Sequence, residues 1–201
     1  GVVGVGERVG LLGGDGRLVR QWIAGLMGNP ALPASVLARL LTVAEWPDGG
    51  SSWLARCPLD ARGTQVLVAS AQTGHWLGAV ENPAADVEVL ARLVRDPVPR
   101  VRFAYAALVG DFGRRIPEGV LEVLAGDGQA RIRRAVTRWD VPPWVRERLA
   151  GDDDAAVRAA AVTEQLWASA APAVRESLLA DPAPEVRDAL AVLFAGERER
   201  G

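Results

Sequence analysis

A phrase of six positions recurs four times in the second half of the sequence, and it constrains the fold more than any other feature. The phrase reads Val-x-x-x-Leu-x-x-Asp-x-x-x-x-Val/Ile-Arg-x-Ala. Its aspartates are Asp96, Asp127, Asp152 and Asp181, which lie 31, 25 and 29 residues apart. Six positions keep fixed offsets while the connections vary in length. This pattern is typical of stacked repeats, in which each repeat packs on its neighbours.

The phrase predicts two short helices joined by a turn. Its Val and Leu are four residues apart and therefore lie on one face of a first helix. We expect the Asp to begin the second helix, with its carboxylate accepting a hydrogen bond from a free amide. The following Val and Ala, three residues apart, are expected on the buried face, where Ala permits close helix approach. Each helix has room for about two to three turns, and such a pair must stack to bury its apolar side.

The arginine of the phrase follows its Val or Ile directly and therefore points away from the apolar line. The four positions are Arg102, Arg133, Arg158 and Arg187. We predict an ion-pair ladder, in which each arginine binds the aspartate of an adjacent repeat. The alternative is a row of arginines that binds a ligand.

The segments DPVPRVR (96–102) and DPAPEVR (181–187) resemble the HEAT-repeat motif. The short and irregular spacing is also similar to bacterial short HEAT-like repeats and to the leucine-rich repeat variant. The resemblance covers about residues 79–195. It implies a right-handed superhelix of short helices, and it implies that the protein acts by binding other proteins.

The first half of the sequence contains degenerate copies of the same repeat. Val36 and Leu40 occupy the first two positions of one copy, and Val66 and Ser70 occupy those of another. The segment 11–27 reads as a degenerate first repeat or cap. We therefore predict an all-α fold, a right-handed α-solenoid of about six to seven short HEAT-like repeats. It would form one domain over 1–201, with degenerate repeats in 1–78, regular repeats in 79–195 and a tail in 196–201.

Composition supports a core of small aliphatic side chains. Apolar residues make up 49% of the chain and aromatic residues only 5%, so Val, Leu and Ala must fill the interior. No run of residues is long and apolar enough to span a membrane. The single cysteine, Cys57, excludes an intramolecular disulfide and favours a reducing, cytoplasmic location.

The sequence offers few residues for catalysis. The single histidine, His75, lies 18 residues after Cys57, and nothing in the pattern places the two side chains together. We expect His75 to lie near the start of a helix. The run Asp152–Asp154 is read as charge at a helix N-terminus rather than as a cation site. We therefore assign no catalytic residue, no metal site and no cofactor, and favour a protein that is not an enzyme.

Charge is unevenly distributed along the chain and indicates one candidate binding patch. Residues 114–148 carry eight arginines against five acids, or +3, whereas 150–201 carry five arginines against ten acids, or −5. Arg131, Arg134 and Arg138 follow the i, i+3, i+7 spacing of a single helix face. The predicted partner-binding residues are Arg131, Arg134, Arg138, Trp144, Arg114 and Arg115. The competing interpretation is a solvated face without a partner.

The sequence therefore predicts a non-catalytic scaffold that binds a protein or peptide partner, with acidic chemistry in that partner. The alternative is a HEAT-like DNA-binding protein or a DNA glycosylase-type enzyme with a basic concave face. Asp140 beside Trp139 is the constellation that would serve the enzyme. The formal net charge of −2 disfavours bulk nucleic-acid binding.

Overall fold

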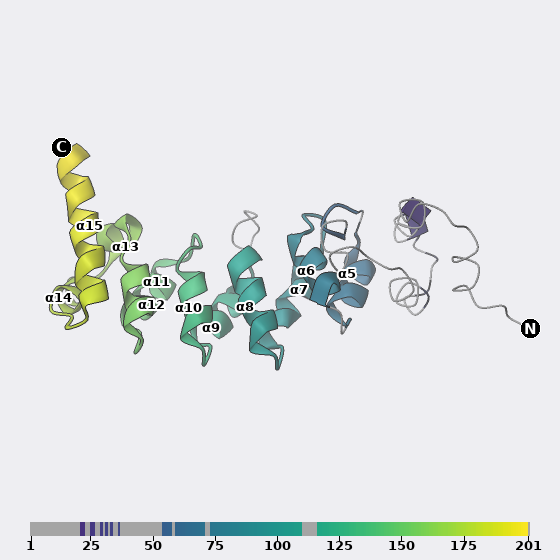
Figure 1. Ribbon diagram of the computed structural model, residues 1–201, viewed down its shortest axis with the longest axis horizontal. Helices are drawn as coiled ribbons and strands as arrows, with labels where there is room; N and C mark the ends of the chain where they lie inside the picture. The colour runs from purple at the N-terminus through teal and green to yellow at the C-terminus, as the bar shows by residue number, and fades with distance from the viewer. Residues whose placement is uncertain are drawn as a thin grey trace, which may run out of the picture. The chain divides into compact units, whose positions relative to one another are not determined.

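The computed structural model describes residues 54–57, 59–70, 73–109 and 116–200, together with scattered positions between 21 and 36. Every regular element in these ranges is a helix and none is a strand, so the all-α prediction is confirmed for them (Figure 1). Contacts divide the chain into two compact units, Gly1–Arg92 and Leu93–Gly201. The division falls 14 residues after the predicted boundary between degenerate and regular repeats (93 − 79).

The first unit contains α5 (Ala61–Val68), α6 (Thr73–Glu81) and α7 (Val87–Leu90), and α5 packs on both of the others. Asp60 and Asp86 cap α5 and α7, since their carboxylates accept the amides of Gly63 at 2.6 Å and Val89 at 2.9 Å. A 3-10 helix, η2 (Ala91–Arg95), follows α7. These caps satisfy amides that the first helical turn leaves without partners.

The second unit repeats one helix pair. Its first helices are α9 (Glu118–Ala125), α11 (Pro143–Ala150) and α14 (Pro172–Leu179). Its second helices are α8 (Pro99–Leu108), α10 (Ala130–Val136), α12 (Ala155–Ala161) and α15 (Pro184–Arg200). The short α13 (Glu164–Ser169) lies between two pairs. The second helices pack in chain order, α8 on α10, α10 on α12 and α12 on α15, while α11 packs on α9 and α14 (Figure 1).

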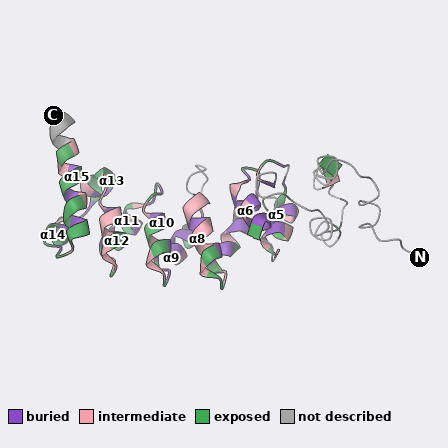
Figure 2. Ribbon diagram, viewed as in Figure 1, coloured by how far each residue is buried: buried purple, intermediate pink, exposed green. Residues whose placement is uncertain are grey.

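The buried stripe of each second helix consists of the phrase's Val or Ile and the residue four positions later. Ile132 and Val136 are fully buried in α10, and Val157 and Ala161 occupy the same places in α12. Figure 2 colours such buried positions purple. We predicted that the phrase's Ala would face a packed neighbour. Ala135 is buried, but Ala160 is only half-buried. A residue three positions after the phrase's Val or Ile lies farther around the helix from the buried stripe than a residue four positions after it.

Each repeat aspartate lies before its helix rather than at the cap, which corrects the sequence-based expectation. Its Oδ1 accepts the amide of the residue two positions later, at 2.8 Å for Asp96 and 2.9 Å for Asp127, Asp152 and Asp181. The residues that cap α8, α10 and α12 are Val98, Gln129 and Asp154. The aspartate therefore forms an Asx-turn that leads into the helix. Its second oxygen is left available to a neighbouring repeat.

The arginine ladder is confirmed across three pairs. Nε of the arginine donates to Oδ2 of the next repeat's aspartate at 2.6 Å for Arg102–Asp127, 2.6 Å for Arg133–Asp152 and 2.7 Å for Arg158–Asp181. Nη2 donates to Oδ1 in the same pairs, at 3.2, 2.7 and 3.0 Å. Nη1 donates to the carbonyl of its own repeat's aspartate, at 2.8, 2.7 and 2.8 Å. Each guanidinium thus ties two consecutive repeats together in a bidentate pair.

The ladder lowers the pKa of all three aspartates. At Asp181 the hydrogen bond from Arg158 is the largest influence and lowers the pKa. At Asp127 and Asp152 burial on its own would raise the pKa, but it is outweighed by the hydrogen bonds from Arg102 or Arg133 and from the Asx-turn amide together with the positive charge of the neighbouring arginines. A carboxyl whose pKa is lower in the folded chain stabilises the fold above its unfolded pKa, which is about 3.9. That stabilisation disappears as pH falls through the folded pKa.

We therefore expect acid to weaken the fold over a defined window. The free energy of unfolding should vary little with these groups between about pH 7 and pH 5, and should fall below about pH 4. Urea unfolding at a series of pH values measures this dependence. Asp152→Asn removes one titrating partner, so this variant should be less stable at neutral pH and lose less on acidification. A variant that loses as much stability in acid as the parent protein would contradict the role assigned to Asp152.

Candidate partner-binding groove

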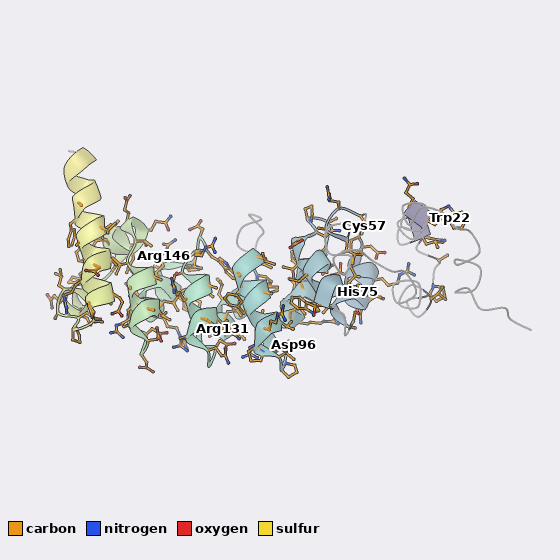
Figure 3. The ribbon with its side chains drawn as sticks, viewed as in Figure 1. Trp22, Cys57, His75, Asp96, Arg131 and Arg146 are labelled. Atoms are coloured by element: carbon orange, nitrogen blue, oxygen red, sulfur yellow. The ribbon has the colours of Figure 1, made fainter. Side chains whose placement is uncertain are left out.

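The three arginines of the predicted patch line one groove in the second unit. Arg131 and Arg134 lie on α10, Arg138 follows the C-cap residue Thr137, and all three side chains are exposed. The groove has a volume of about 910 Å³ and extends over α8, α10, α12 and α13. Figure 3 labels Arg131, which lies on α10. The i, i+3, i+7 spacing thus predicted residues that the fold brings to a common cavity.

Small side chains form much of the groove wall. Its alanines come from three successive second helices and are Ala107, Ala130, Ala135, Ala156 and Ala160. Ala135 and Ala160 are the repeat alanines that were expected to face a packed neighbour. Small residues at these positions leave space between adjacent helices, and that space is the groove.

The arginines differ in how firmly they are held. The Arg131 guanidinium carbon lies 5.5 Å from the centre of the Phe103 ring, and its Nε donates to Oε1 of Gln129 at 3.0 Å. A cation over an aromatic face is stabilised and oriented by the ring. The guanidinium of Arg134 has no hydrogen-bond or ion-pair partner among the described residues, whereas the Arg134 carbonyl accepts from Thr137. Arg134 is therefore well placed to bind an external carboxylate.

Two carboxylates also line the groove, and both are already bonded within the chain. Asp140 accepts from Nη2 of Arg146 at 2.9 Å, although its side chain is 92% exposed. Figure 3 labels Arg146 on α11. Asp154 caps α12 by accepting the amides of Ala156 at 2.9 Å and Val157 at 3.2 Å. Neither carboxylate is paired with Arg134, so neither neutralises the charge of the Arg134 guanidinium.

The remaining predicted residues do not join this groove. Trp144 lies in the first turn of α11, where it is 38% exposed, but it does not line the cavity. Arg114 and Arg115 lie outside the described residues. Trp139 lines the groove but is only 5% exposed, and its indole N–H donates to the carbonyl of Ala106 at 2.9 Å. The Trp139 side chain therefore serves the core.

Phe103 is an aromatic groove residue that was not among the predicted partner-binding residues. It lies two positions after Val101, and Arg134 lies two positions after Ile132, so both occupy the same place in successive repeats. Because equivalent positions of a repeat lie on the same side of the stack, aligning the four copies would have identified Phe103. Of the residues at this position, only Arg134 was predicted to bind a partner.

Cys57 and His75, both in the first unit, are held in structural roles. The Cys57 thiol is buried and donates to the carbonyl of Leu54 at 3.3 Å, and burial raises its pKa to about 11. His75 is the third residue of α6, near the helix start as expected. It is 1% exposed, its Nδ1 lies 2.7 Å from Oγ of Ser70, and burial lowers its pKa. A thiol with a raised pKa is the opposite of an activated nucleophile.

The described part of the chain contains no cluster of three or more His, Cys, Asp or Glu side chains arranged to hold a metal ion. In the same residues, no helix has the length and apolar character needed to cross a membrane. Comparison with protein-family models, with curated proteins and with solved structures finds no match to this chain.

Proposed function

We propose that this chain is a HEAT-like α-solenoid of about six to seven repeats that works in the cytoplasm as a non-catalytic scaffold. It would bind an acidic segment of a protein partner in the groove lined by Arg131, Arg134 and Arg138. The observation that carries the proposal is the separation of two sets of arginines. Arg102, Arg133 and Arg158 bind the aspartates of the ladder, whereas Arg131 and Arg134 line the groove and take no part in the ladder.

The repeated architecture supports the scaffold part of the proposal. The same helix pair, Asx-turn and guanidinium contact recur at successive copies of the phrase. Stacked helical repeats create extended surfaces suited to binding other macromolecules. The right-handed superhelix follows from the resemblance of the phrase to the HEAT motif, the number of repeats follows from the degenerate copies in the first half of the sequence, and both remain part of this proposal.

The groove's chemistry supports an acidic protein segment as the ligand. Three guanidinium groups offer paired donors that match the geometry of carboxylates. Phe103 and the alanine wall add apolar surface on which the stem of a Glu side chain can pack. Each exposed ion pair contributes only about 0.2–1 kcal/mol, so several carboxylates must bind together for a stable complex.

A DNA-binding or glycosylase-type function is the competing proposal, and it would use the same arginine row. The aspartate and tryptophan that it also needs have other roles in this structure. Asp140 binds Arg146, and the Trp139 ring is buried with its N–H bonded to Ala106. The acidic-peptide proposal does not depend on either side chain.

Fluorescence anisotropy of a labelled poly-glutamate peptide tests the proposed function. We expect saturable binding at about 0.05 M salt that weakens strongly at about 0.5 M salt, because the Debye length shortens as salt rises. A poly-lysine peptide of equal length is the matched control and should not bind at the groove. Failure to bind poly-glutamate at low salt would contradict the proposal, and stronger salt-dependent binding of a labelled DNA duplex would support the competing one.

A further inference from the structure

The exposed side of the second helices changes its charge from one end of the unit to the other. Two positions show this change, one residue before and two residues after the phrase's Val or Ile. Along the stack these positions are Arg100 and Phe103 in α8, Arg131 and Arg134 in α10, Ala156 and Ala159 in α12, and Glu185 and Asp188 in α15. The row is therefore basic over α8 and α10, neutral over α12 and acidic over α15.

The repeat register places these residues on one side of the stack. Ile132 in α10 and Val186 in α15 are both fully buried, and both helices pack on α12. Residues at equal offsets from these anchors point in corresponding directions. Arg134 and Asp188 are both exposed at the offset of two residues. The acids of α15 thus continue the same surface that holds the groove arginines.

We propose that this surface binds a second copy of the chain, with the acidic row of α15 from one copy seated against the arginine row of α10 from the other. The proposal rests on the proposed function, since it names the acidic partner of the same groove. A two-fold axis running along α12 would bring α10 of each copy opposite α15 of its partner. Arg131 would then face the partner's Glu185, and Arg134 would face the partner's Asp188.

Self-complementarity of charge is the argument for a second copy rather than an unrelated acidic protein. A two-fold interface uses the same patch on both subunits. If the patch has a basic end and an acidic end, the basic end of each copy meets the acidic end of the other, and two equivalent contacts form. The helix on the axis, α12, carries only alanine at the two positions, which permits close approach. The 74% exposed Val192 lies at the offset of Arg138 and supplies an apolar contact for the partner's groove.

A charge exchange between Arg134 and Asp188 tests this arrangement. Sedimentation velocity at low salt should show a monomer–dimer equilibrium that shifts toward monomer at high salt. Arg134→Glu alone and Asp188→Arg alone should each raise the dissociation constant at least about tenfold, since each puts like charges opposite one another. The double variant Arg134→Glu/Asp188→Arg should restore the dimer, because the two charges are exchanged in both copies at once.

Glu176→Arg provides the matched control, since it makes the same charge change at an exposed position of a first helix, α14. It should leave the dissociation constant of the dimer unchanged. A dimer that the double variant does not restore, or that Glu176→Arg weakens as much as Asp188→Arg does, would overturn the proposed face. A chain that stays monomeric at all concentrations would overturn the dimer. If that monomer still binds poly-glutamate through Arg134, the proposed function stands without the dimer.

Discussion

Arg133→Ala should lower the free energy of unfolding by about 2–4 kcal/mol. The guanidinium of Arg133 joins Oδ1 and Oδ2 of Asp152 to the carbonyl of Asp127. Removing it leaves the Asp152 carboxylate, whose side chain is 8% exposed, with only the Asx-turn amide of Asp154 as a bonding partner. Loss of one member of a buried pair is costly because the remaining charge keeps its desolvation penalty. Urea unfolding at neutral pH measures the change.

Arg187→Ala is the matched control for this substitution. Arg187 occupies the same position of the phrase and donates Nη1 to the carbonyl of Pro182 at 2.6 Å, but it has no carboxylate partner among the described residues. Its removal should cost less than about 1 kcal/mol, in the range of a single exposed contact. Equal losses at Arg133 and Arg187 would show that the carboxylate pair contributes nothing, and the ladder would no longer account for how the repeats are joined.

The ladder was predictable because it depends on offsets that the sequence states directly. The arginine and the aspartate recur at the same places in every repeat. Because successive repeats stack in the same way, the two side chains form an ion pair between all neighbouring repeats or between none. The helix start was harder to predict, because an aspartate before a helix can be the N-cap or can form an Asx-turn two residues earlier. Both arrangements satisfy an amide, and Asp154 is an N-cap whereas Asp152 is not.

In the candidate site, too, some features could be predicted from the sequence and others could not. The spacing of Arg131 and Arg134 predicted a shared face because both residues lie on α10, where helical period alone decides it. Arg138 lies beyond the end of α10 and lines the groove from the segment that follows the helix. The depth of the groove depends on small residues in neighbouring helices, and the sequence does not state which helices are neighbours. Trp139 and Trp144 are close in the chain and equally apolar. Packing against a helix 33 residues away buries the Trp139 ring, whose N–H bonds to Ala106, and leaves Trp144 exposed.

Reversal of the three groove arginines tests the central claim most directly. Arg131→Glu/Arg134→Glu/Arg138→Glu should weaken poly-glutamate binding by at least about tenfold, since about 0.2–1 kcal/mol is lost at each of three pairs and the new glutamates repel the peptide. The melting temperature should change little, because these side chains are exposed and the ladder is intact. Arg92→Glu/Arg95→Glu/Arg148→Glu makes the same change in net charge at exposed positions that do not line the groove.

Anisotropy titrations of the two triple variants, set beside their thermal unfolding curves, provide the decisive comparison. We predict that the groove variant loses binding at an unchanged melting temperature, and that the control variant loses only the small amount due to overall charge. If both variants bind equally well, or lose affinity equally, the groove formed by α8, α10 and α12 is not the binding site.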